Sequence, residues 1–553
     1  MEITLLAWGC AGEARTPPKP PRPTLRRDDA VAAGEFGTGV GLADLDGDAA
    51  HLADLVLASG NDMDPGPVTL FAHAGPGKRP FGDAPAQRSE DRRNFNDTCL
   101  GDVDGNGFVD VAVVRAWDEH ADMARGGVDV FLNHGGVLSG KPDVTWSVGG
   151  YVPYACDFGD VDGDGRLDLG VAVLWDRGGI NEGPATMLKV LIAKNRGRLR
   201  VYRNLGTGFD PSYWQSAGDE GFMGLSFDDV DGDGDLDLVA VGRRVQAFFS
   251  EAGKLPAEPG FRSRSRYLIP YGLDVARRDD GSAWIVVSTG CEYPIQSAPG
   301  CVGQYVAYDV RPSDLAATPT FATARLHNPG PVLLHDLDGD RHPELVGGSW
   351  GRAVVAGEDG PDTQRKNEGG PLYVYRGSPA GPSRTPCLAS EENLVSQYVA
   401  AGSARPGLAT EERETRITAA GGGALVDLGD GVSRITAVTV DGVEAPWAWT
   451  PEHDWVSVGG TRPGAAVVVR WLHREARDLV VGNWKGAPGG ALLYLQDADF
   501  AYDCDGIGFI EPSIEGLQRI IPADADPDPA SGILHPALED PRDALPIGYF
   551  PGL

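Results

Sequence analysis

The stretch Gly159-Asp160-Val161-Asp162-Gly163-Asp164-Gly165 sets aspartates at alternate positions of a glycine-rich turn, and Asp168 then opens a run of apolar residues. The pattern occurs five times, with Asp44, Asp102, Asp160, Asp229 and Asp336 as the first aspartates. Successive copies are therefore 58, 58, 69 and 107 residues apart. Repeats of about this length are typical of propellers, solenoids and repeat arrays.

The interval of 107 residues contains a degenerate copy of the same unit. Arg278-Asp279-Asp280-Gly281 stands where the acidic turn is expected, and the apolar run 284–287 follows it. Short runs rich in β-branched and aromatic residues follow each copy, separated by glycine turns, as in antiparallel strands. Small sheets of this kind cannot bury both faces alone, whereas sheets arranged radially bury one another. The repeats therefore predict an all-β fold, with six blades of a β-propeller up to residue 376.

A seventh repeat is interrupted by an insertion. The run 397–402 has the pattern of a strand that precedes an acidic turn, and 477–484 and 491–495 have the pattern of the strands that follow one. Residues 405–475 contain four alternating apolar runs, which predict a small β-sandwich. We therefore expect a seven-bladed β-propeller with a small β-sandwich inserted in the last blade. The alternative is six blades followed by a separate β domain.

The rest of the expected organisation follows from composition. It comprises a signal-like segment at 1–10, a Pro-rich tether at 11–30, blades one to six and the start of blade seven at 31–400, the insertion at 405–475, the rest of blade seven at 476–500, and a C-terminal tail at 501–553.

The acidic turns have the residue types of calcium sites. Ca²⁺ takes six to eight oxygen ligands, and aspartates at alternate positions of a tight turn converge on one point. The alternative is an Asx-turn hairpin stabilised by its own backbone hydrogen bonds. That alternative does not account for several carboxylates placed together, because like charges repel one another. The predicted ligands are Asp102, Asp104, Asn106, Asp110, Asp160, Asp162, Asp164, Asp168, Asp229, Asp231, Asp233, Asp237, Asp44, Asp46, Asp48, Asp336, Asp338, Asp340 and Glu344.

The first and last turns depart from the pattern. In the first, Ala49 replaces the glycine and the closing acid is displaced by two residues to Asp54. In the last, Arg341 replaces the glycine and Pro343 stiffens the turn. The degenerate fifth copy is expected to bind no metal, because Arg277 and Gly281 occupy ligand positions.

Three turns and one strand resemble a known repeat family. DVDGNGFVDV at 102–111, DVDGDGRLDL at 160–169, DVDGDGDLDL at 229–238 and the strand VYRNLGTGF at 201–209 resemble the FG-GAP/VCBS repeats of integrin-α-type β-propellers. The resemblance covers roughly residues 35–500 apart from the insertion. It implies the propeller fold, and it implies a recognition face at the rim opposite the calcium turns. It does not fix the function, because that fold hosts adhesion, carbohydrate binding and catalysis.

Four tryptophans recur at one repeat position, near the predicted end of the strand that begins at the acidic turn. Exposed indoles at the opposite rim would stack on sugar rings or anchor a protein partner. The alternative is that these side chains pack between blades. They are Trp117, Trp175, Trp350 and Trp484.

Charge and motif content exclude several functions. Asp and Glu number 80 against 48 Lys and Arg, a net charge of −32, which argues against a nucleic-acid or anionic-membrane partner, since either would need a basic face. Five calcium ions would neutralise ten of these charges, so the acidity does not require a basic partner. The chain contains no GxSxG, HExxH, P-loop or dinucleotide-binding motif, which argues against an enzyme without excluding one.

The N-terminus and the cysteines suggest export. A short apolar run precedes Gly9-Cys10-Ala11-Gly12, an order that resembles a bacterial lipoprotein signal with Cys10 as the lipidated residue. A membrane contact is expected only through that anchor. The alternative is an ordinary cysteine in a frayed terminus. Without Cys10, six cysteines remain, and Cys291 and Cys301 are the predicted disulfide because only a short segment separates them.

These features together predict an exported, non-enzymatic, calcium-binding β-propeller, either a cell-surface lipoprotein or a secreted or periplasmic protein. Its role would be ligand binding or adhesion, with a protein or a glycan as the partner. The alternatives are a carbohydrate-active enzyme with its site on the tryptophan rim and a scaffold subunit of a surface assembly.

Overall fold

The computed structural model describes residues 24–494 with gaps, the longest at 118–125, 175–196 and 354–366. Every regular element within the described residues is a β-strand. The predicted signal segment with Cys10, most of the tether and the tail at 501–553 lie outside the described residues.

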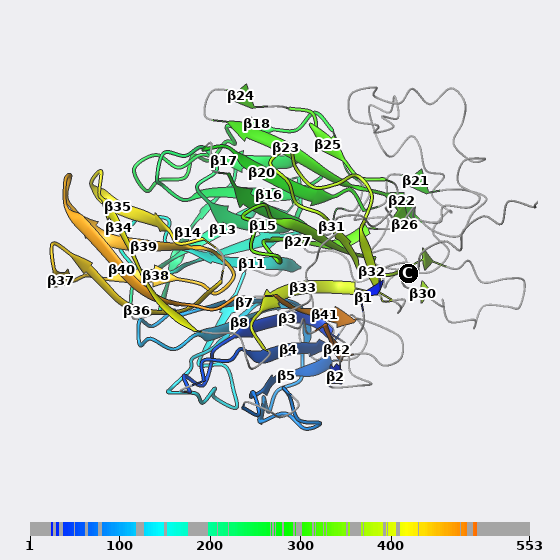
Figure 1. Cartoon of the computed structure of the whole chain (residues 1–553), viewed down its shortest axis with the longest axis horizontal. Helices are drawn as coiled ribbons and strands as arrows, with labels where there is room; N and C mark the ends of the chain where they lie inside the picture. Colours follow the sequence, from blue (N-terminus) through cyan, green and yellow to red (C-terminus); the bar gives the residue numbers. More distant parts are fainter. Residues whose placement is uncertain are drawn as a thin grey trace, which may run out of the picture.

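Seven antiparallel sheets repeat one plan, in which consecutive strands pair with their neighbours along the chain (Figure 1). Sheet one is β3 (Gly37–Ala43), β4 (Asp54–Gly60), β5 (Pro65–Phe71) and β6 (Gln87–Arg88); sheet two is β7 (Asn94–Gly101), β8 (Asp110–Trp117), β9 (Gly127–Phe131) and β10 (Val144–Ser147); sheet three is β11 (Pro153–Gly159), β12 (Asp168–Val173), β13 (Leu199–Asn204) and β14 (Phe209–Gln215); sheet four is β15 (Phe222–Asp228), β16 (Asp237–Gly242), β17 (Val245–Phe248) and β18 (Phe261–Arg262).

The last three sheets of the plan carry additions. Sheet five is β19 (Leu273–Arg277), β20 (Ala283–Ser288), β23 (Tyr305–Arg311) and β24 (Asp314–Leu315), with β25 (Phe321–Ala322) also on β23; sheet six is β27 (Pro329–His335), β28 (Glu344–Ser349), β31 (Tyr373–Tyr375), β32 (Leu388–Ser390) and β1 (Thr24–Leu25); sheet seven is β33 (Ser396–Gly402), β41 (Asp478–Asn483), β42 (Gly490–Tyr494) and β2 (Asp29–Val31). Two small sheets accompany them, β21 (Tyr293–Pro294), β22 (Cys301–Gly303) and β26 (Leu326–His327), and β29 (Arg352–Ala353) with β30 (Asn367–Glu368).

The first strands of the seven sheets contact one another in a closed cycle. β3 contacts β7, and the contacts continue through β11, β15, β19, β27 and β33 back to β3. Close approach along this cycle depends on glycine: a Cβ on Gly159 would lie 2.7 to 2.8 Å from the Phe227 ring and its Cβ in the next sheet. These radially packed antiparallel sheets make a propeller-like all-β fold.

The outermost strand of sheet seven comes from the other end of the chain. β2 pairs antiparallel with β42, and β1 pairs parallel with β32 of sheet six. Residues 24–31 fall largely in the segment predicted to be a tether. An extended segment pairs readily with an exposed sheet edge, because the edge offers unpaired backbone groups.

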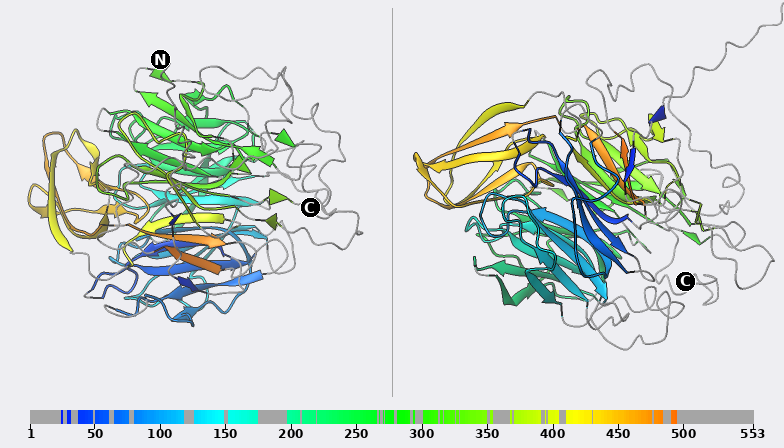
Figure 2. Two further views of the ribbon diagram at one scale, coloured as in Figure 1. Left: turned by 45° about the vertical axis from the view of Figure 1, so that its right-hand side comes forward. Right: turned by 90° about the horizontal axis from the view of Figure 1, so that it is seen from below.

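Residues 411–473 form two further sheets between β33 and β41. They are β34 (Glu411–Thr418), β40 (Ala466–His473), β36 (Val432–Val440) and β37 (Val443–Glu444), and β35 (Gly422–Asp427), β39 (Trp455–Thr461) and β38 (Trp447–Trp449). β33 and β41 pair directly across this stretch. The two sheets lie to one side of the other seven, in yellow and orange in Figure 1 and in both views of Figure 2. Their apolar side chains share one core with sheets one and two.

A disulfide joins two neighbouring sheets. Cys99 of β7 is bonded to Cys156 of β11, with the Cα atoms 6.1 Å apart and a sequence separation of 57. The predicted pair Cys291–Cys301 lies outside the described residues because Cys291 is not among them.

We expect the double variant Cys99→Ala/Cys156→Ala to unfold about 4 kcal/mol more easily, because the crosslink restricts a long loop in the unfolded chain. Urea denaturation followed by circular dichroism measures the change. A loss below about 1 kcal/mol would show that this bond contributes little.

Candidate metal centres

Each acidic turn is closed by a buried acid that opens the second strand of its sheet. In sheet three, Asp168 Oδ2 accepts a hydrogen bond from Val161 N at 3.2 Å, and its Oδ1 accepts one from Asn204 N at 2.8 Å. One carboxylate thus ties the turn to the end of the third strand. The same pair of bonds, at 2.6 to 3.1 Å, is made by Asp54, Asp110, Asp237 and Glu344.

The first aspartate of the turn holds the chain reversal. Asp160 Oδ2 accepts from Gly165 N at 2.7 Å, and Gly165 has φ +83°. A positive φ is easily adopted by glycine and strained for other residues. In the sixth sheet Arg341 takes this position with φ +70°, and its N–H donates to Asp336 Oδ2 at 2.8 Å.

The turns bring acids from the first, third and ninth positions together. Carboxylate oxygens of each group lie within 4.8 Å of one another, a spacing that suits coordination of one ion. The groups are Asp102, Asp104 and Asp110; Asp160, Asp162 and Asp168; Asp229, Asp231 and Asp237; and, in the first turn, Asp44, Asp46 and Asp54.

Burial makes these carboxylates costly to ionise. Desolvation, together with the neighbouring acids of the same turn, raises the pKa of Asp168 to about 8 and that of Asp237 to about 9. The pKa of Asp110 is raised to about 8 for the same reasons. A cation placed among the three acids would remove this cost, because it favours the charged form of each carboxyl.

The donor set fits a hard cation. The acids of these four groups offer only oxygen atoms, as Ca²⁺ and Mg²⁺ prefer. In the first group His51 Nδ1 also lies 2.7 Å from Asp44 Oδ2. In sheet three the buried Asp162 Oδ1 has no hydrogen-bond partner among the described residues, while Oδ2 of the same carboxylate lies 3.2 Å from Arg203 Nη1. An oriented oxygen without a donor is what a metal ligand requires.

The fifth position of each turn is absent from the acid groups, although third-position acids such as Asp104 and Asp231 make the same kind of backbone bond as it does. Its side chain accepts a hydrogen bond from the backbone two residues later, as in an Asx turn. This applies to Asp48, Asn106, Asp164, Asp233 and Asp340. Asp164 also forms an ion pair with Arg166. Their role as metal ligands stays a prediction.

The sixth sheet keeps the closing acid. Burial, together with Asp338 and Asp336, raises the pKa of Glu344 to about 8. Glu344 accepts from Leu337 N at 2.9 Å and from Gly377 N at 3.0 Å. The turn therefore has the same clamp as the others despite Arg341 and Pro343.

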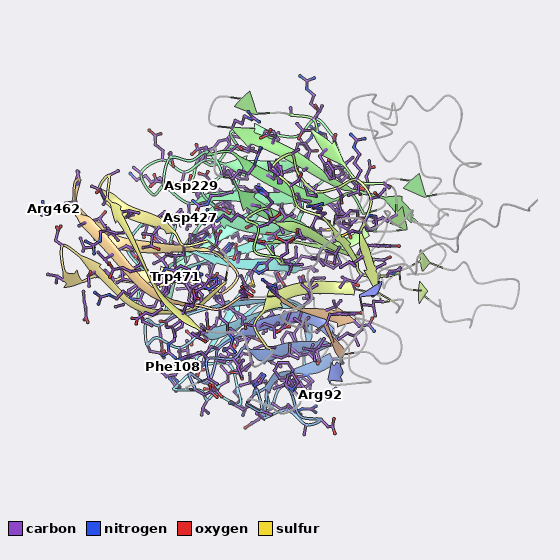
Figure 3. All side chains as sticks on the ribbon, viewed as in Figure 1. Arg92, Phe108, Asp229, Asp427, Arg462 and Trp471 are labelled. Carbon is purple, nitrogen blue, oxygen red and sulfur yellow. A yellow bond between two sulfur atoms is a disulfide. The ribbon has the colours of Figure 1, made fainter. Side chains whose placement is uncertain are left out.

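In the degenerate fifth copy, an arginine occupies the ligand position. Arg277 Nε lies 3.3 Å from Asp228 Oδ1, its Nη1 lies 3.8 Å from Asp229 Oδ2, and its Nη2 lies 3.2 Å from Asp427 Oδ2. Figure 3 shows Asp229 and Asp427 near each other, where β35 meets sheet four. The guanidinium thus supplies positive charge both to the neighbouring fourth turn and to the insertion.

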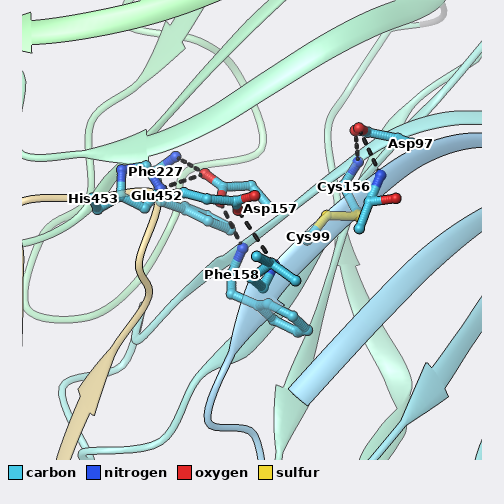
Figure 4. The surroundings of a disulfide bond; sticks show 10 residues. Asp97, Cys99, Cys156, Asp157, Phe158, Phe227, Glu452 and His453 are labelled. Atoms are coloured by element: carbon cyan, nitrogen blue, oxygen red, sulfur yellow. Dashed lines mark hydrogen bonds and ion pairs between the residues drawn. A yellow bond between two sulfur atoms is a disulfide. The ribbon is translucent and has the colours of Figure 1, made fainter. Parts of the chain in front are cut away.

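A loop of the insertion contacts the first strands of sheets two and three. His453 Nε2 lies 3.0 and 3.1 Å from the two carboxylate oxygens of Asp157 (Figure 4). The His453 ring also stacks on Trp455. Burial alone lowers the pKa of His453, but Asp157, Asp228 and Glu452 outweigh it and raise the pKa to about 9. Burial raises the pKa of the adjacent Glu452 to about 8.

Aspartates on the first strands link adjacent sheets near this loop. Asp97 Oδ2 accepts from Cys156 N at 3.0 Å, Asp157 Oδ2 from Phe227 N at 2.7 Å, and Asp274 Oδ2 from Leu334 N at 2.6 Å. Figure 4 shows the first two of these bonds beside the disulfide. The His453–Asp157 pair therefore joins the insertion to a carboxylate that already links sheets three and four.

The insertion also touches the acidic turns themselves. Ser457 Oγ donates to Asp160 Oδ2 at 2.7 Å, and Arg434 Nη1 lies 3.7 Å from Asp44 Oδ2. The guanidinium of Arg434 also lies over the Phe108 ring at 5.8 Å. Two of the four acid groups thus have an insertion side chain on their first aspartate.

Sequence reasoning missed a sixth closing acid and the two residues of the insertion loop. Asp478 opens β41 and accepts from Ala404 N at 2.7 Å, the same bond that the other closing acids make. Its signal was present, because Asp478-Leu479-Val480 repeats Asp54-Leu55-Val56 and Asp237-Leu238-Val239. Glu452 and His453 had no comparable sequence signal.

The tryptophan positions are only partly described. Trp117 is the last residue of β8 in the backbone, but its side chain lies outside the described part of the chain. Trp175, Trp350 and Trp484 also lie outside it, so the ligand-binding rim stays a prediction. Among the described residues, the structure contains no helix with the length and hydropathy needed to cross a membrane.

Comparison with known proteins identifies the repeats. Residues 102–171 and 188–240 match the family model of the FG-GAP-like repeat, and these segments include the second, third and fourth acidic turns. Among solved structures, BBS1N in complex with ARL6DN, soaked with mercury, matches at 12% identity and TM-score 0.39, covering 84% of this chain and 100% of that chain. The lead-soaked form of the same complex matches at 12% identity and TM-score 0.35, covering 82% and 96%. No curated protein matches the chain.

The strained turn of sheet six gives a stability test. We expect Arg341→Gly to stabilise the protein by about 0.5–1 kcal/mol, because glycine adopts the positive φ without strain. Arg341→Ala keeps the strain and should give no gain. Equal denaturation midpoints for the glycine and alanine variants would contradict the interpretation.

The buried His453–Asp157 pair gives a pH-dependent test. We expect His453→Gln to lower the free energy of unfolding at neutral pH by about 3 kcal/mol, as for a broken buried charge pair. Because the pKa is raised from 6.5 to about 9, this contribution is complete below pH 6.5 and is lost as the pH rises through about 9. Urea denaturation of wild type and variant across this range measures it.

The exposed His134 provides the control, since His134→Gln should leave stability unchanged at every pH. A deficit of His453→Gln that is the same at both ends of the pH range would exclude a charged histidine in this pair.

Proposed function

The chain is an FG-GAP repeat protein, and on that premise we propose that it is a seven-bladed β-propeller that binds calcium in its acidic turns and presents a ligand-binding or adhesive surface outside the cell. The proposed role is binding rather than catalysis.

The seven-blade count is supported by the cycle of contacts among the first strands of the seven sheets. Pairing of β33 with β41 favours a split seventh blade over six blades and a separate domain, because the insertion interrupts one sheet between its first and second strands. Closure by β2 on β42 would then tie the N-terminal segment to the last blade.

Calcium binding is carried by one observation: four turns each gather three carboxylates within 4.8 Å of one another, and all of these except the exposed Asp104 are buried or half-buried. Oxygen-only donors favour Ca²⁺ over softer metals, and flexible turn geometry favours it over Mg²⁺, which requires a near-ideal octahedron. The sixth turn, with Asp336, Asp338, Asp340 and Glu344, is proposed as the fifth site.

An extracellular or periplasmic location is supported by the Cys99–Cys156 disulfide, since such bonds persist in oxidising compartments. Calcium is also abundant outside cells, where modules of low affinity are saturated. Anchoring through Cys10 remains part of the proposal.

Calcium should stabilise the protein against unfolding. A concentration about 100 times the dissociation constant adds about 2.7 kcal/mol per site. We expect the thermal midpoint to rise with calcium and fall with a chelator, and Asp168→Asn to bind one calcium fewer by calorimetric titration.

Asp478→Asn is the matched control. Asp478 makes the same backbone bond as Asp168, but no alternating aspartates precede it, so the number of bound calcium ions should not change. An identical midpoint with calcium and with chelator, or equal stoichiometry for wild type and Asp168→Asn, would contradict calcium binding at the turns.

A further inference from the structure

A pocket of about 880 Å³ lies between sheets five and six, within the size range of small-molecule sites. Its walls come from β20 and β23, from the turn of the degenerate fifth copy, from the sixth acidic turn, and from residues 376–384 after β31. These strands lie together in the green part of Figure 1. Of the acidic turns, only the sixth contributes to the lining, through Asp340 and His342.

The pocket is positively charged in an acidic protein. Four arginines line it, Arg278, Arg311, Arg376 and Arg384, against two acids, Asp309 and Asp340. The lining thus has an excess of two positive charges, whereas the chain has a net charge of −32. Low-dielectric walls of one sign concentrate counter-ions of the opposite sign.

The two acids do not each form an ion pair with a separate arginine. Asp309 is shared, with Arg311 Nη2 at 2.9 Å and Arg278 Nη1 at 3.5 Å. Asp340 Oδ1 accepts from the backbone N–H of His342, and Asp340 belongs to a turn proposed to hold calcium. Calcium there would make the pocket still more positive.

Two donors in the wall lack protein acceptors. The Arg384 guanidinium and the His342 imidazole have no hydrogen-bond or ion-pair partner among the described residues. The Arg384 backbone carbonyl, by contrast, accepts from Ala324 N at 2.7 Å, which fixes the position of this residue. A planar guanidinium on a fixed backbone matches the paired oxygens of a carboxylate, phosphate or sulfate group.

The aromatic wall does not offer a stacking surface. The Arg278 guanidinium lies over the Trp284 ring at 4.7 Å, and a Cβ on Gly381 would lie 3.2 Å from the indole. Trp284 is only 6% exposed. A neutral sugar ring would therefore find no open indole face, and charge is left as the basis of recognition.

We propose that this pocket binds a small ligand with an oxyanion group, a carboxylate, phosphate or sulfate, and that Arg384 is a principal contact. The inference rests on the ligand-binding part of the proposed function and names a site whose lining does not include the four repeat-position tryptophans. It does not depend on calcium at the turns of sheets one to four.

Isothermal titration at low ionic strength with saturating calcium tests the proposal. The probes are sulfate, glucose 6-phosphate and glucuronate, with glucose as the uncharged comparison. We expect at least one anion to bind with a dissociation constant of about 1 mM or tighter, more weakly as salt is added, and no binding of glucose. The anion that binds identifies the group.

Arg384→Gln should weaken that binding about tenfold or more, and Arg384→Lys less, because lysine keeps the charge without the paired donors. The control is Arg462→Gln at the far end of the insertion (Figure 3), which removes an exposed arginine and should change nothing. Wild-type thermal midpoints would show that the variants fold.

The proposal is overturned if none of the three anions binds, if glucose binds equally well, or if Arg384→Gln binds as wild type does. Calcium-dependent stabilisation is measured separately on the same protein. Failure of anion binding beside an intact calcium effect would therefore remove the pocket and leave the proposed calcium sites standing.

Discussion

Burial of a carboxylate at the start of the second strand is the constraint on which the rest of this structure depends. The acid must lie inside the sheet to clamp the turn to the third strand, as Asp168 does through Val161 and Asn204. Desolvation makes that position costly for a charge and raises the pKa of Asp168 to about 8. Positive charge beside the closing acid would therefore favour its ionised form. The alternating aspartates of the turn could hold a cation that supplies this charge.

The repeats differ in what surrounds the position of the closing acid. Four turns gather further acids around the closing acid, in an arrangement that could hold a metal ion. The fifth copy has lost the closing acid, and its Arg277 supplies a guanidinium to the fourth turn instead. The seventh sheet keeps its acid, Asp478, but the insertion replaces the turn, and the buried carboxylate serves as a structural hydrogen-bond acceptor for Ala404 N. Copies of one unit have thus diverged in what surrounds a common clamp.

Local pattern was enough to predict the all-β class and the repeated turns, because both depend on residues close in sequence. The bonds between repeats were not predictable in the same way. Asp157 reaches Phe227, and His453 reaches Asp157 across 296 residues, and no sequence spacing encodes either contact. Asp478 lies between these cases: the motif Asp-Leu-Val was visible, but without an acidic turn before it the residue had no reason to stand out. The pocket between sheets five and six likewise arises from packing of segments about 100 residues apart.

The insertion is coupled to the acidic turns through shared atoms rather than through proximity alone. Asp160 Oδ2, an oxygen of the third acid group, already accepts from Ser457 Oγ and Gly165 N, so an ion in that turn would share the carboxylate with the insertion. Arg434 stands near Asp44 in the first turn, and Arg277 holds Asp427 beside Asp229 of the fourth. Each of these contacts changes in strength when a divalent cation takes over the carboxylate's charge, because the attraction of serine or arginine for that oxygen then falls. If the turns bind a divalent cation as proposed, its occupancy and the docking of the insertion would be linked thermodynamically, and each would alter the affinity of the other.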